Sequence, residues 1–191
     1  MNARMNAHMN GSLFLTTENP KDDFDDLGSL SALLYELKLI GEKKLDYYLC
    51  GDKFPQLITF MGCAPHLVFS PPEDGSSSFC HIKLLKFDQP KLFTGQQTAP
   101  PRCPACRYRI SEWKKELNLD TSDEDSTDKW ECPKCHQQSA LTDLDWRQSG
   151  GAGKILIEIK NIFPGEAVPV DKLLASLRDL SESTWKYFYI V

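Results

Sequence analysis

The sequence predicts an α+β protein: a mixed β-sheet with an N-terminal helix and a C-terminal β-α-β unit, interrupted by an inserted cysteine-rich segment. Apolar residues recur at helical spacing early in the chain, which indicates an amphipathic helix. Short aliphatic and aromatic segments follow, as is typical of strands. The last part of the chain shows a strand, a helix and a strand in succession. Together these three observations favour the α+β class.

The N-terminal helix is predicted from five apolar residues at positions i, i+3, i+4, i+7 and i+10, with Gly41 as its natural stop. These residues are Leu30, Leu33, Leu34, Leu37 and Ile40. Three strand segments come next, separated by turns that contain glycine and proline. They span residues 45–50, 56–61 and 79–87, and their order suggests a meander.

The C-terminal part begins with a predicted strand at residues 154–162, which carries isoleucines on one face. Leucines at helical spacing then predict a helix that begins near Pro169 or Asp171. Residues 185–191 form another strand, apolar on both faces apart from Lys186, which favours an interior position in the sheet. A strand, a helix and a strand at this spacing predict a crossover with the two strands parallel.

Composition divides the chain into a leader, a core and an insertion. Residues 1–26 repeat Met-Asn-Ala and then become acidic, so we expect a disordered leader. Residues 27–96 and 153–191 are assigned to the α+β core domain, and residues 97–152 to the insertion. Within the insertion, the acidic, Ser/Thr-rich stretch 120–128 is expected to be a solvated, mobile loop.

The overall composition is that of a soluble globular protein, with 41% hydrophobic and 26% charged residues. No apolar run reaches the roughly 20 residues that a membrane span needs, and no secretory signal is visible. We therefore expect a cytoplasmic protein without membrane contact. The formal net charge is −5, whereas a nucleic-acid binder usually shows a concentrated basic face. A protein partner is therefore favoured over nucleic acid.

Four of the seven cysteines form two C-x2-C pairs separated by 25 residues, namely Cys103 with Cys106 and Cys132 with Cys135. Two residues between cysteines let a tight turn aim both sulfurs at one point, and two such turns supply the four thiolates of a tetrahedral zinc site. The sequence therefore predicts one zinc ion bound by these four side chains. The other three cysteines, Cys50, Cys63 and Cys80, are interpreted as small buried apolar side chains.

The paired C-P-x-C segments resemble the zinc ribbon, a family with rubredoxin-like knuckles at the tips of facing β-hairpins. The resemblance covers residues 101–146, although Arg107 and His136 stand where the family often has glycine. It implies a structural zinc, because four thiolates leave no open position for water or substrate. Iron in a rubredoxin-like site is the alternative metal. Residues 154–189 also resemble a segment of uncharacterised bacterial proteins, and this resemblance implies no particular activity.

Three catalytic or cofactor patterns are partly matched. The segment 132–136 reads C-x-x-C-H, the haem-attachment signature, but haem would leave the other cysteine pair unexplained. Residues 150–154 suggest a phosphate loop, but Ile155 stands where Ser or Thr is needed, and the segment opens a strand. Either cysteine pair could be a thiol-disulfide centre, although two pairs together favour a metal. No catalytic residue is therefore assigned.

Two further places could contact a partner. The first is a basic and aromatic group around the first cysteine pair, a mixture that can bind phosphates and stack on bases. It consists of Arg102, Arg107, Arg109 and Trp113. The second is Glu166, in the loop at 163–169 that follows the predicted strand, because such loops often carry binding residues.

These observations favour a non-enzymatic zinc-binding protein that acts as a protein-interaction module or adaptor. An RNA- or DNA-associated factor that uses the basic and aromatic group is the first alternative. A thiol oxidoreductase is the second. The fold class alone does not decide among them.

Overall fold

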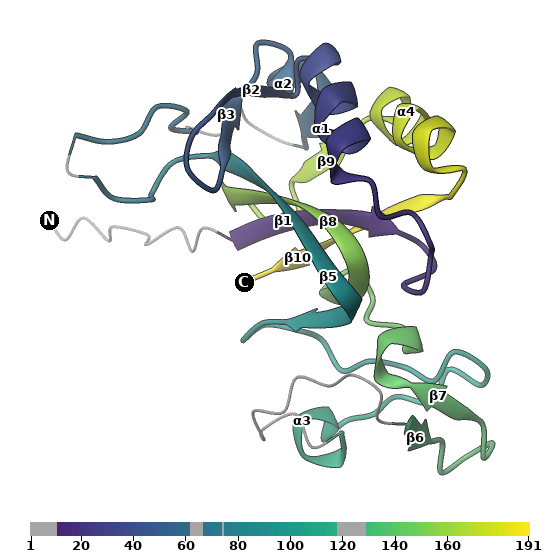
Figure 1. The fold of residues 1–191 in the computed structure, drawn as a ribbon. Coiled ribbons are helices and arrows are strands. Elements are labelled where there is room, and N and C mark those ends of the chain that lie inside the picture. Colours follow the sequence, from purple (N-terminus) through teal and green to yellow (C-terminus); the bar gives the residue numbers. More distant parts are fainter. Residues whose placement is uncertain (1–10, 62–66, 74, 118–128) are drawn as a thin grey trace, which may run out of the picture.

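The computed structural model describes residues 11–61, 67–73, 75–117 and 129–191. It confirms the α+β class, with a six-stranded sheet, two two-stranded sheets and short and long helices (Figure 1). The strands of the large sheet, in spatial order, are β10 (Trp185–Ile190), β1 (Gly11–Thr17), β8 (Gly150–Ile162), β5 (His81–Thr94), β3 (Tyr48–Cys50) and β2 (Ile40–Lys43). Neighbouring strands in this sheet all run antiparallel, where the sequence predicts a mixed sheet.

Strand β1 corrects the expectation of a leader over residues 1–26. All seven residues of Gly11–Thr17 are buried, and the strand pairs with β10 on one side and with β8 on the other. The physical reason is that Leu13, Phe14 and Leu15 are apolar on both faces, so a central strand removes more of their surface from water than a solvated tail could. Residues 1–10 lie outside the described part of the chain.

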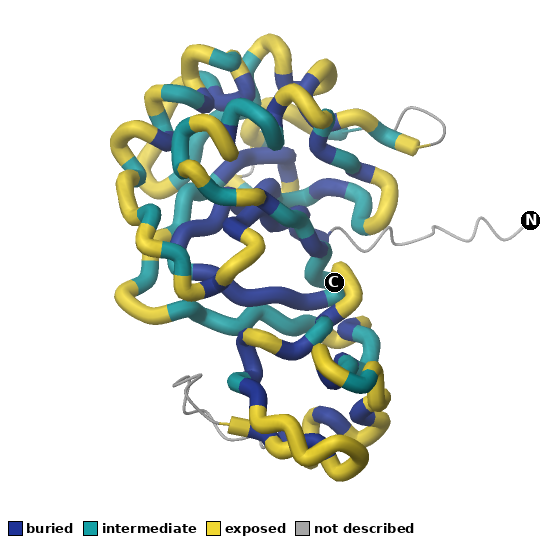
Figure 2. Tube along the Cα trace, turned by 90° about the vertical axis from the view of Figure 1, so that its right-hand side faces the viewer, coloured by how far each residue is buried: buried dark blue, intermediate teal, exposed yellow. Residues whose placement is uncertain are grey.

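Helices α1 (Leu27–Glu36) and α4 (Asp171–Ser181) cover one face of the sheet (Figure 1). They enclose the main core with the sheet, and Figure 2 shows buried stretches of the chain in the interior. The carboxylate of Asp26 caps α1 by accepting a hydrogen bond from the Ser29 backbone N–H, 2.9 Å away. The helix ends before Gly41, the predicted stop, because Lys38 adopts a left-handed backbone with φ of 59°. The predicted helical residue Ile40 instead begins β2.

Strands β8 and β10 are parallel to each other, because both run antiparallel to β1. The predicted β-α-β unit is therefore present with β1 placed between its two strands. The expectation that residues 185–191 occupy the sheet interior is wrong, since β10 forms an edge. Its apolar residues are instead buried by α4 on one face and by an aromatic cluster on the other.

That aromatic cluster lies on the face opposite the helices and is centred on Phe14 and Phe188, whose rings stack with centroids 5.1 Å apart. The long pairing of β5 with β8 is interrupted by a bulge between Lys86 and Lys91. Bulges bend strands, and here the second half of β5 brings Phe93 to within 5.0 Å of the Phe14 ring. The aromatic cluster is thereby covered by the sheet itself.

The segment predicted as a strand at 56–61 is divided between two elements. Helix α2 (Phe54–Leu57) precedes β4 (Ile58–Phe60), which pairs with β9 (Ala167–Pro169) in a separate two-stranded sheet. This pairing joins the segment before β5 to the segment after β8. The predicted meander of the three segments is therefore wrong, because β3 pairs directly with β5 and the middle segment pairs with β9.

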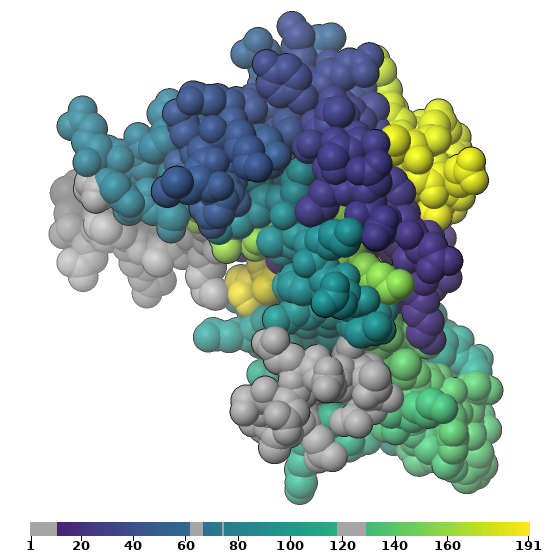
Figure 3. Space-filling model, viewed as in Figure 1, coloured from purple at the N-terminus to yellow at the C-terminus, as the bar shows by residue number. Residues whose placement is uncertain are grey.

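Between β5 and β8 the chain leaves the sheet as a unit that we call the cysteine module, residues 97–149. Its described parts contain α3 (Trp113–Glu116), the two-stranded sheet of β6 (Lys129–Glu131) and β7 (Gln138–Ala140), and the 3-10 helix η1 (Leu141–Asp143). The cysteine module forms a lobe at the end of the molecule away from α1 and α2 (Figures 1 and 3). The predicted acidic loop at 120–128 lies outside the described residues.

Candidate metal centre

The entry and exit of the cysteine module are tied together by side-chain hydrogen bonds. The Thr98 hydroxyl donates to the Ser149 carbonyl over 2.7 Å and accepts from the Gly95 N–H over 2.7 Å. The Ser149 hydroxyl in turn accepts from the Ala99 N–H at 2.8 Å. These contacts hold the start and the end of the module side by side at the base of the large sheet.

The two cysteine pairs are turns of the same construction. In the first turn, the Cys103 N–H donates to the Tyr108 carbonyl over 2.9 Å, and the Arg107 N–H donates to the Cys103 carbonyl over 3.0 Å. In the second turn, the Cys132 N–H donates to the Gln137 carbonyl over 3.0 Å, and the His136 N–H donates to the Cys132 carbonyl over 2.9 Å. In both turns these hydrogen bonds span five and four residues. Each turn therefore presents its two sulfurs on one side of the backbone.

Arg107 and His136 occupy the positions that favour glycine in such turns, and both adopt the left-handed backbone, with φ of 63° and 60°. This conformation costs a residue with a Cβ about 1–2 kcal/mol. The geometry of the turn is therefore kept in spite of the sequence departure. Some compensating interaction in the folded module must hold the strained residues in place.

The four sulfurs converge. Cys103 Sγ lies 3.7 Å from Cys135 Sγ, and Cys106 Sγ lies 3.5 Å from Cys132 Sγ. All four Sγ atoms lie within 4.8 Å of one another. A tetrahedral ion with metal–sulfur bonds of 2.3 Å places its ligands about 3.8 Å apart. The arrangement is consistent with one metal ion such as zinc, held as in a zinc-knuckle-type site.

Electrostatics favour a cation at this centre. Burial opposes charge on Cys132, but the backbone N–H groups of Cys135 and Lys134 point at its sulfur and lower its pKa to about 7. For Cys135, the Gln137 N–H acts in the same direction, but burial and the three neighbouring sulfurs outweigh it and raise the pKa to about 12. A divalent ion bound here would deprotonate its thiol ligands.

The cysteine module has its own hydrophobic core beside the sulfurs. Trp113 and Trp146 meet edge to face with centroids 5.3 Å apart, and the Trp146 indole N–H donates to the Leu141 carbonyl over 2.9 Å. The buried members of this core are Cys103, Ile110, Trp113, Leu117, Trp130, Cys132, Leu141, Leu144 and Trp146. Such a small core removes little surface from water, so a metal ion would add much to its stability.

The four residues of the predicted basic and aromatic group differ in their exposure and in their partners. Trp113 is only 6% exposed and belongs to the module core, which corrects its assignment as a stacking residue. Arg107 pairs with Asp145 over 2.8 Å, and the backbone of half-buried Arg102 bridges to Arg109 and to Asp145. Arg109 is exposed. Arg107 is exposed as well, but its guanidinium is already paired with Asp145.

Glu166, the predicted loop residue, is exposed in the turn between β8 and β9. Its carbonyl accepts a hydrogen bond from the Met61 N–H over 2.9 Å, which extends the pairing of β9 with β4. The backbone of this loop thus has a clear structural role. Glu166 does not line the cavity beside β10 that is described below.

The glycine-rich segment at the start of β8 has a packing role instead of a phosphate-binding one. A Cβ on Gly153 would stand 2.0 Å from the Thr16 hydroxyl, and one on Gly151 would stand 2.5 Å from the Phe188 ring. The Thr16 hydroxyl donates to the Ile155 carbonyl over 2.8 Å. The glycines therefore leave room against β8 for two side chains, Thr16 of β1 and Phe188 of β10.

Cys50 and Cys80 are partly and fully buried, as predicted, and their sulfurs lie 3.6 Å apart. Cys63 lies outside the described residues. A residue that sequence reasoning did not assign to any site is Lys186, the one charged residue of β10, which lines a cavity between the sheet edge and the cysteine module. Its isolation in an apolar segment was the available signal.

In comparisons with known proteins, no protein-family model, curated protein or solved structure shows significant similarity to this chain. The geometry of the site therefore carries the functional argument. The longest helix that the structure describes, α4, has 11 residues, and no described helix combines the length and apolarity that a membrane span requires.

Proposed function

We propose that the chain is a non-enzymatic adaptor, in which one structural zinc ion holds the cysteine module in shape for contact with another protein. The observation that carries this proposal is the convergence of four cysteine sulfurs within 4.8 Å. A tetrahedral ion with four thiolate ligands has no open coordination position, so no substrate can reach it. In this account the metal supplies shape and stability, and the surfaces around it supply recognition.

Zinc is preferred over iron because it carries no redox chemistry and suits a closed tetrahedral thiolate site. The two equivalent C-P-x-C turns are similar to those of zinc ribbons, which supports the same choice. Zinc binding at small sites contributes on the order of 10–16 kcal/mol of apparent free energy at neutral pH. That amount is large compared with what the small module core can provide.

A protein partner is favoured over nucleic acid by charge. From residue 101 to residue 150 the sequence has eight Lys or Arg and ten Asp or Glu residues. One of the candidate phosphate contacts, Arg107, is already paired with Asp145, and the candidate stacking residue Trp113 is buried. Salt-dependent binding to a phosphate backbone needs several free cations on one surface.

Exposed Tyr108 beside exposed Arg109 is the observation that keeps an RNA- or DNA-associated role as a second candidate. An aromatic side chain beside a guanidinium can stack on unpaired bases. Binding of single-stranded oligonucleotide that weakens steeply with salt and is lost in the double variant Tyr108→Ala/Arg109→Ala would support this candidate over the adaptor role. The thiol oxidoreductase alternative would instead require titratable thiols at the four cysteines of the purified protein.

The adaptor role is tested by affinity capture from the native cell with three forms of the tagged protein. Wild type is compared with Cys132→Ser, which removes a buried sulfur of the cluster, and with Cys50→Ser, which removes a thiol outside it. We expect defined protein partners that survive nuclease treatment, that are retained by Cys50→Ser and that are lost with Cys132→Ser. Capture that depends on nucleic acid, or that is unchanged in Cys132→Ser, contradicts the proposal.

A further inference from the structure

The outer edge of β10 presents backbone groups that no described residue pairs. The Glu18 N–H donates to the Thr184 carbonyl over 2.7 Å, so Thr184 faces β1, and in an antiparallel pair every second residue does the same. On the other side, the Tyr189 N–H donates outward to the Gln148 carbonyl over 2.9 Å. By this alternation the N–H and C=O of Tyr187 point away from the sheet.

The cysteine module therefore already supplies the beginning of an additional strand. Gln148, at the exit of the module, pairs with Tyr189, and Arg147 and Gln148 both have left-handed backbones with φ of 54° and 59°. This conformation turns the chain away from β10 after a single hydrogen bond. The edge beyond that point, from Trp185 to Tyr187, is left without a paired strand in the described part of the chain.

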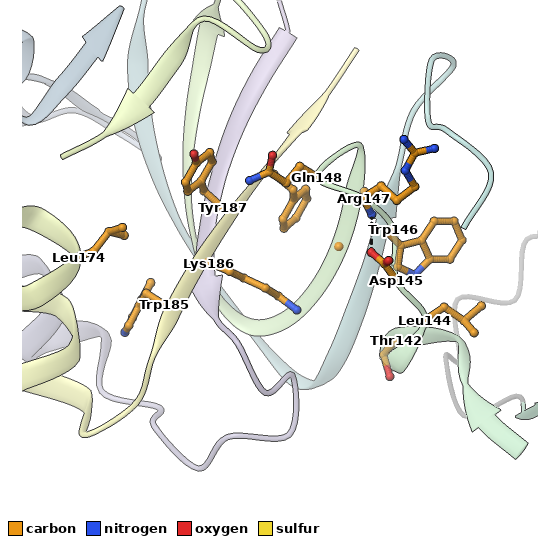
Figure 4. Close-up of a pocket in the computed structure, with 13 residues that line it drawn as sticks. Thr142, Leu144, Asp145, Trp146, Arg147, Gln148, Leu174, Trp185, Lys186 and Tyr187 are labelled. Carbon is orange, nitrogen blue, oxygen red and sulfur yellow. Dashed lines mark hydrogen bonds between the residues drawn. The ribbon is translucent and has the colours of Figure 1, made fainter. Parts of the chain in front are cut away.

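A cavity of about 300 Å³ runs along this unpaired edge (Figure 4). Leu174 of α4 lines it on one side, and Leu144 and Trp146 of the cysteine module line it on the other. The floor is β10 itself, from Trp185 to Phe188. The cavity is thus bounded by the sheet edge, a helix and the module.

Lys186 extends from β10 into this cavity toward the cysteine module (Figure 4). Burial lowers the pKa of Lys186, although nearby carboxylates, first Glu18 and then Asp143 and Asp145, act in the opposite direction. Asp143 already pairs with Lys21 over 3.2 Å and Asp145 with Arg107 over 2.8 Å, while the exposed Glu18 makes no ion pair with Lys186. Lys186 itself makes no ion pair or hydrogen bond with the described residues.

We propose that the outer edge of β10 binds an extended peptide segment of a partner protein, which adds to the sheet as a strand and places a carboxylate beside Lys186. This inference rests on the proposed adaptor function and names the surface and the kind of partner. Strand addition at an exposed sheet edge derives its affinity from backbone hydrogen bonds and its specificity from alternate side chains.

The geometry specifies the pattern of the bound segment. Side chains alternate between the two faces of a strand, so the residue opposite Lys186 lies on the module side, where the ammonium group can pair with Asp or Glu. Its two neighbours then lie on the helix side, toward Leu174, Trp185 and Tyr187. The expected segment is therefore apolar-acidic-apolar, with β-branched or aromatic residues flanking a single carboxylate.

The test selects octapeptides from a random displayed library against the full-length, metal-loaded protein. Peptides with the apolar-acidic-apolar pattern should be enriched. A synthetic peptide with the enriched sequence should slow hydrogen exchange at the Tyr187 amide by about tenfold or more, because that N–H gains a partner. The Tyr189 amide, already bonded to Gln148, serves as the internal reference and should change little.

Variants separate the edge from other surfaces. The variant Lys186→Gln should bind the peptide about tenfold or more weakly than wild type, as expected for the loss of a charged hydrogen bond. The control variant Lys172→Gln, on the exposed side of α4, should bind the peptide as wild type does. Replacing the acidic residue of the peptide by its amide should weaken binding to the wild-type protein to the same level. The same replacement should not weaken binding to the Lys186→Gln variant any further. Because these changes include one made in the peptide alone, a folding defect cannot account for the result.

Several outcomes overturn the inference. They are the absence of any enriched pattern, equal binding to wild type and Lys186→Gln, an unchanged Tyr187 amide, and binding that is unaffected by N-methylation of the peptide backbone. Self-association of the chain through β10, seen as a dimer that the peptide does not displace, would assign the edge to a second copy instead. Metal-dependent capture of a protein partner by Lys186→Gln would leave the adaptor function standing and remove only the proposed edge site.

Discussion

Gly151 lies flat against the aromatic ring of Phe188, so closely that a Cβ at position 151 would stand 2.5 Å from the ring's Cδ1 atom. The Phe188 ring in turn stacks on Phe14, and both are buried within the sheet's second face. We predict that Gly151→Ala lowers the free energy of unfolding by about 1–3 kcal/mol, because the ring cannot move without disturbing the aromatic cluster. Denaturant unfolding of the metal-loaded protein measures the change.

The same chemical change elsewhere provides the control. Gly28 lies in the first turn of α1, where an added Cβ meets only the Asp26 carboxylate oxygen at 3.2 Å. Gly28→Ala should therefore be neutral or stabilising by up to about 1 kcal/mol, through helix propensity. A destabilisation equal to that of Gly151→Ala would show that close packing of Phe188 is not the cause.

His136 offers a stabilising substitution. Its φ of 60° strains a residue with a Cβ, and its exposed ring pairs, among the residues that the structure describes, only with the exposed carboxylate of Glu131. His136→Gly should stabilise the metal-loaded protein by about 0.5–1 kcal/mol, whereas His136→Val should destabilise it by about 1–2 kcal/mol. Thermal unfolding at fixed metal content distinguishes the two. Loss of stability in the glycine variant would indicate that the imidazole has a structural role in the turn.

Tyr189 makes stability depend on alkaline pH. Burial, together with the nearby Tyr187, raises the pKa of Tyr189 to about 12 from the ordinary value of 10.0, and its hydroxyl donates to the Ala167 carbonyl over 2.6 Å. Between these two values the unfolded chain loses the proton before the folded one does, so folding stability should fall as pH rises from about 10 to about 12.

The variant Tyr189→Phe isolates this contribution. It should be less stable than wild type at neutral pH, because the hydrogen bond is lost, but its stability should fall less steeply above pH 10. Equilibrium unfolding at a series of pH values measures both slopes. Identical slopes for the two proteins would assign the alkaline loss to other groups.

Cys50 and Cys80 can be joined covalently. The register of β3 with β5 pairs Tyr48 with Ile82 and Leu49 with His81, which places Cys50 directly opposite Cys80, with sulfurs 3.6 Å apart. The hydrogen bond to Cys80 and burial raise the pKa of the Cys50 thiol, so reaction should be slow. Both thiols should therefore be free in protein purified under reducing conditions.

Excess oxidised glutathione should convert this pair into a disulfide. The two thiols lose two electrons and two protons, oxidised glutathione leaves as two reduced molecules, and the protein mass falls by about 2 Da. Peptide mapping should locate the bond at Cys50 and Cys80, with the variant Cys80→Ala as the control that cannot form it. Mixed disulfides with glutathione, and no internal bond, would contradict the cross-strand geometry.

The helices and the meeting of the cysteine pairs could be predicted because their signals are local. Apolar spacing places α1 and α4, and two residues between cysteines define each turn. That the two turns come together also follows from chemistry, since thiolates gather around one ion. Iron and zinc, however, prefer the same thiolate set, so the sequence pattern leaves both open.

The errors arose where burial on both faces hides the period-2 pattern. Strand β1 has no polar face and follows a polar repeat, so the local sequence pattern places Leu13, Phe14 and Leu15 in a leader. The same burial on both faces of β10 predicts an interior strand. In the structure β10 is an edge strand, and one of its faces is buried because the sheet curves and packs aromatic residues around Phe188. The pairing of β4 with β9 depends on distant segments and left no local signal.

Trp113 shows the limit for the site. An aromatic residue among arginines and lysines fits either a stacking surface or a small core, and the sequence does not distinguish the two. The packing of Trp113 on Trp146 decides in favour of the core. The edge of β10 could not be anticipated, because its exposure follows from the placement of β1 and of the cysteine module in three dimensions.

Zinc-edge X-ray absorption on freshly purified protein, combined with elemental analysis, tests the central claim most directly. The account predicts one zinc per chain with four sulfur ligands at about 2.3 Å and no nitrogen or oxygen ligand. Absence of bound metal, or a first shell with fewer than four sulfurs and an open or water-filled position, would contradict it.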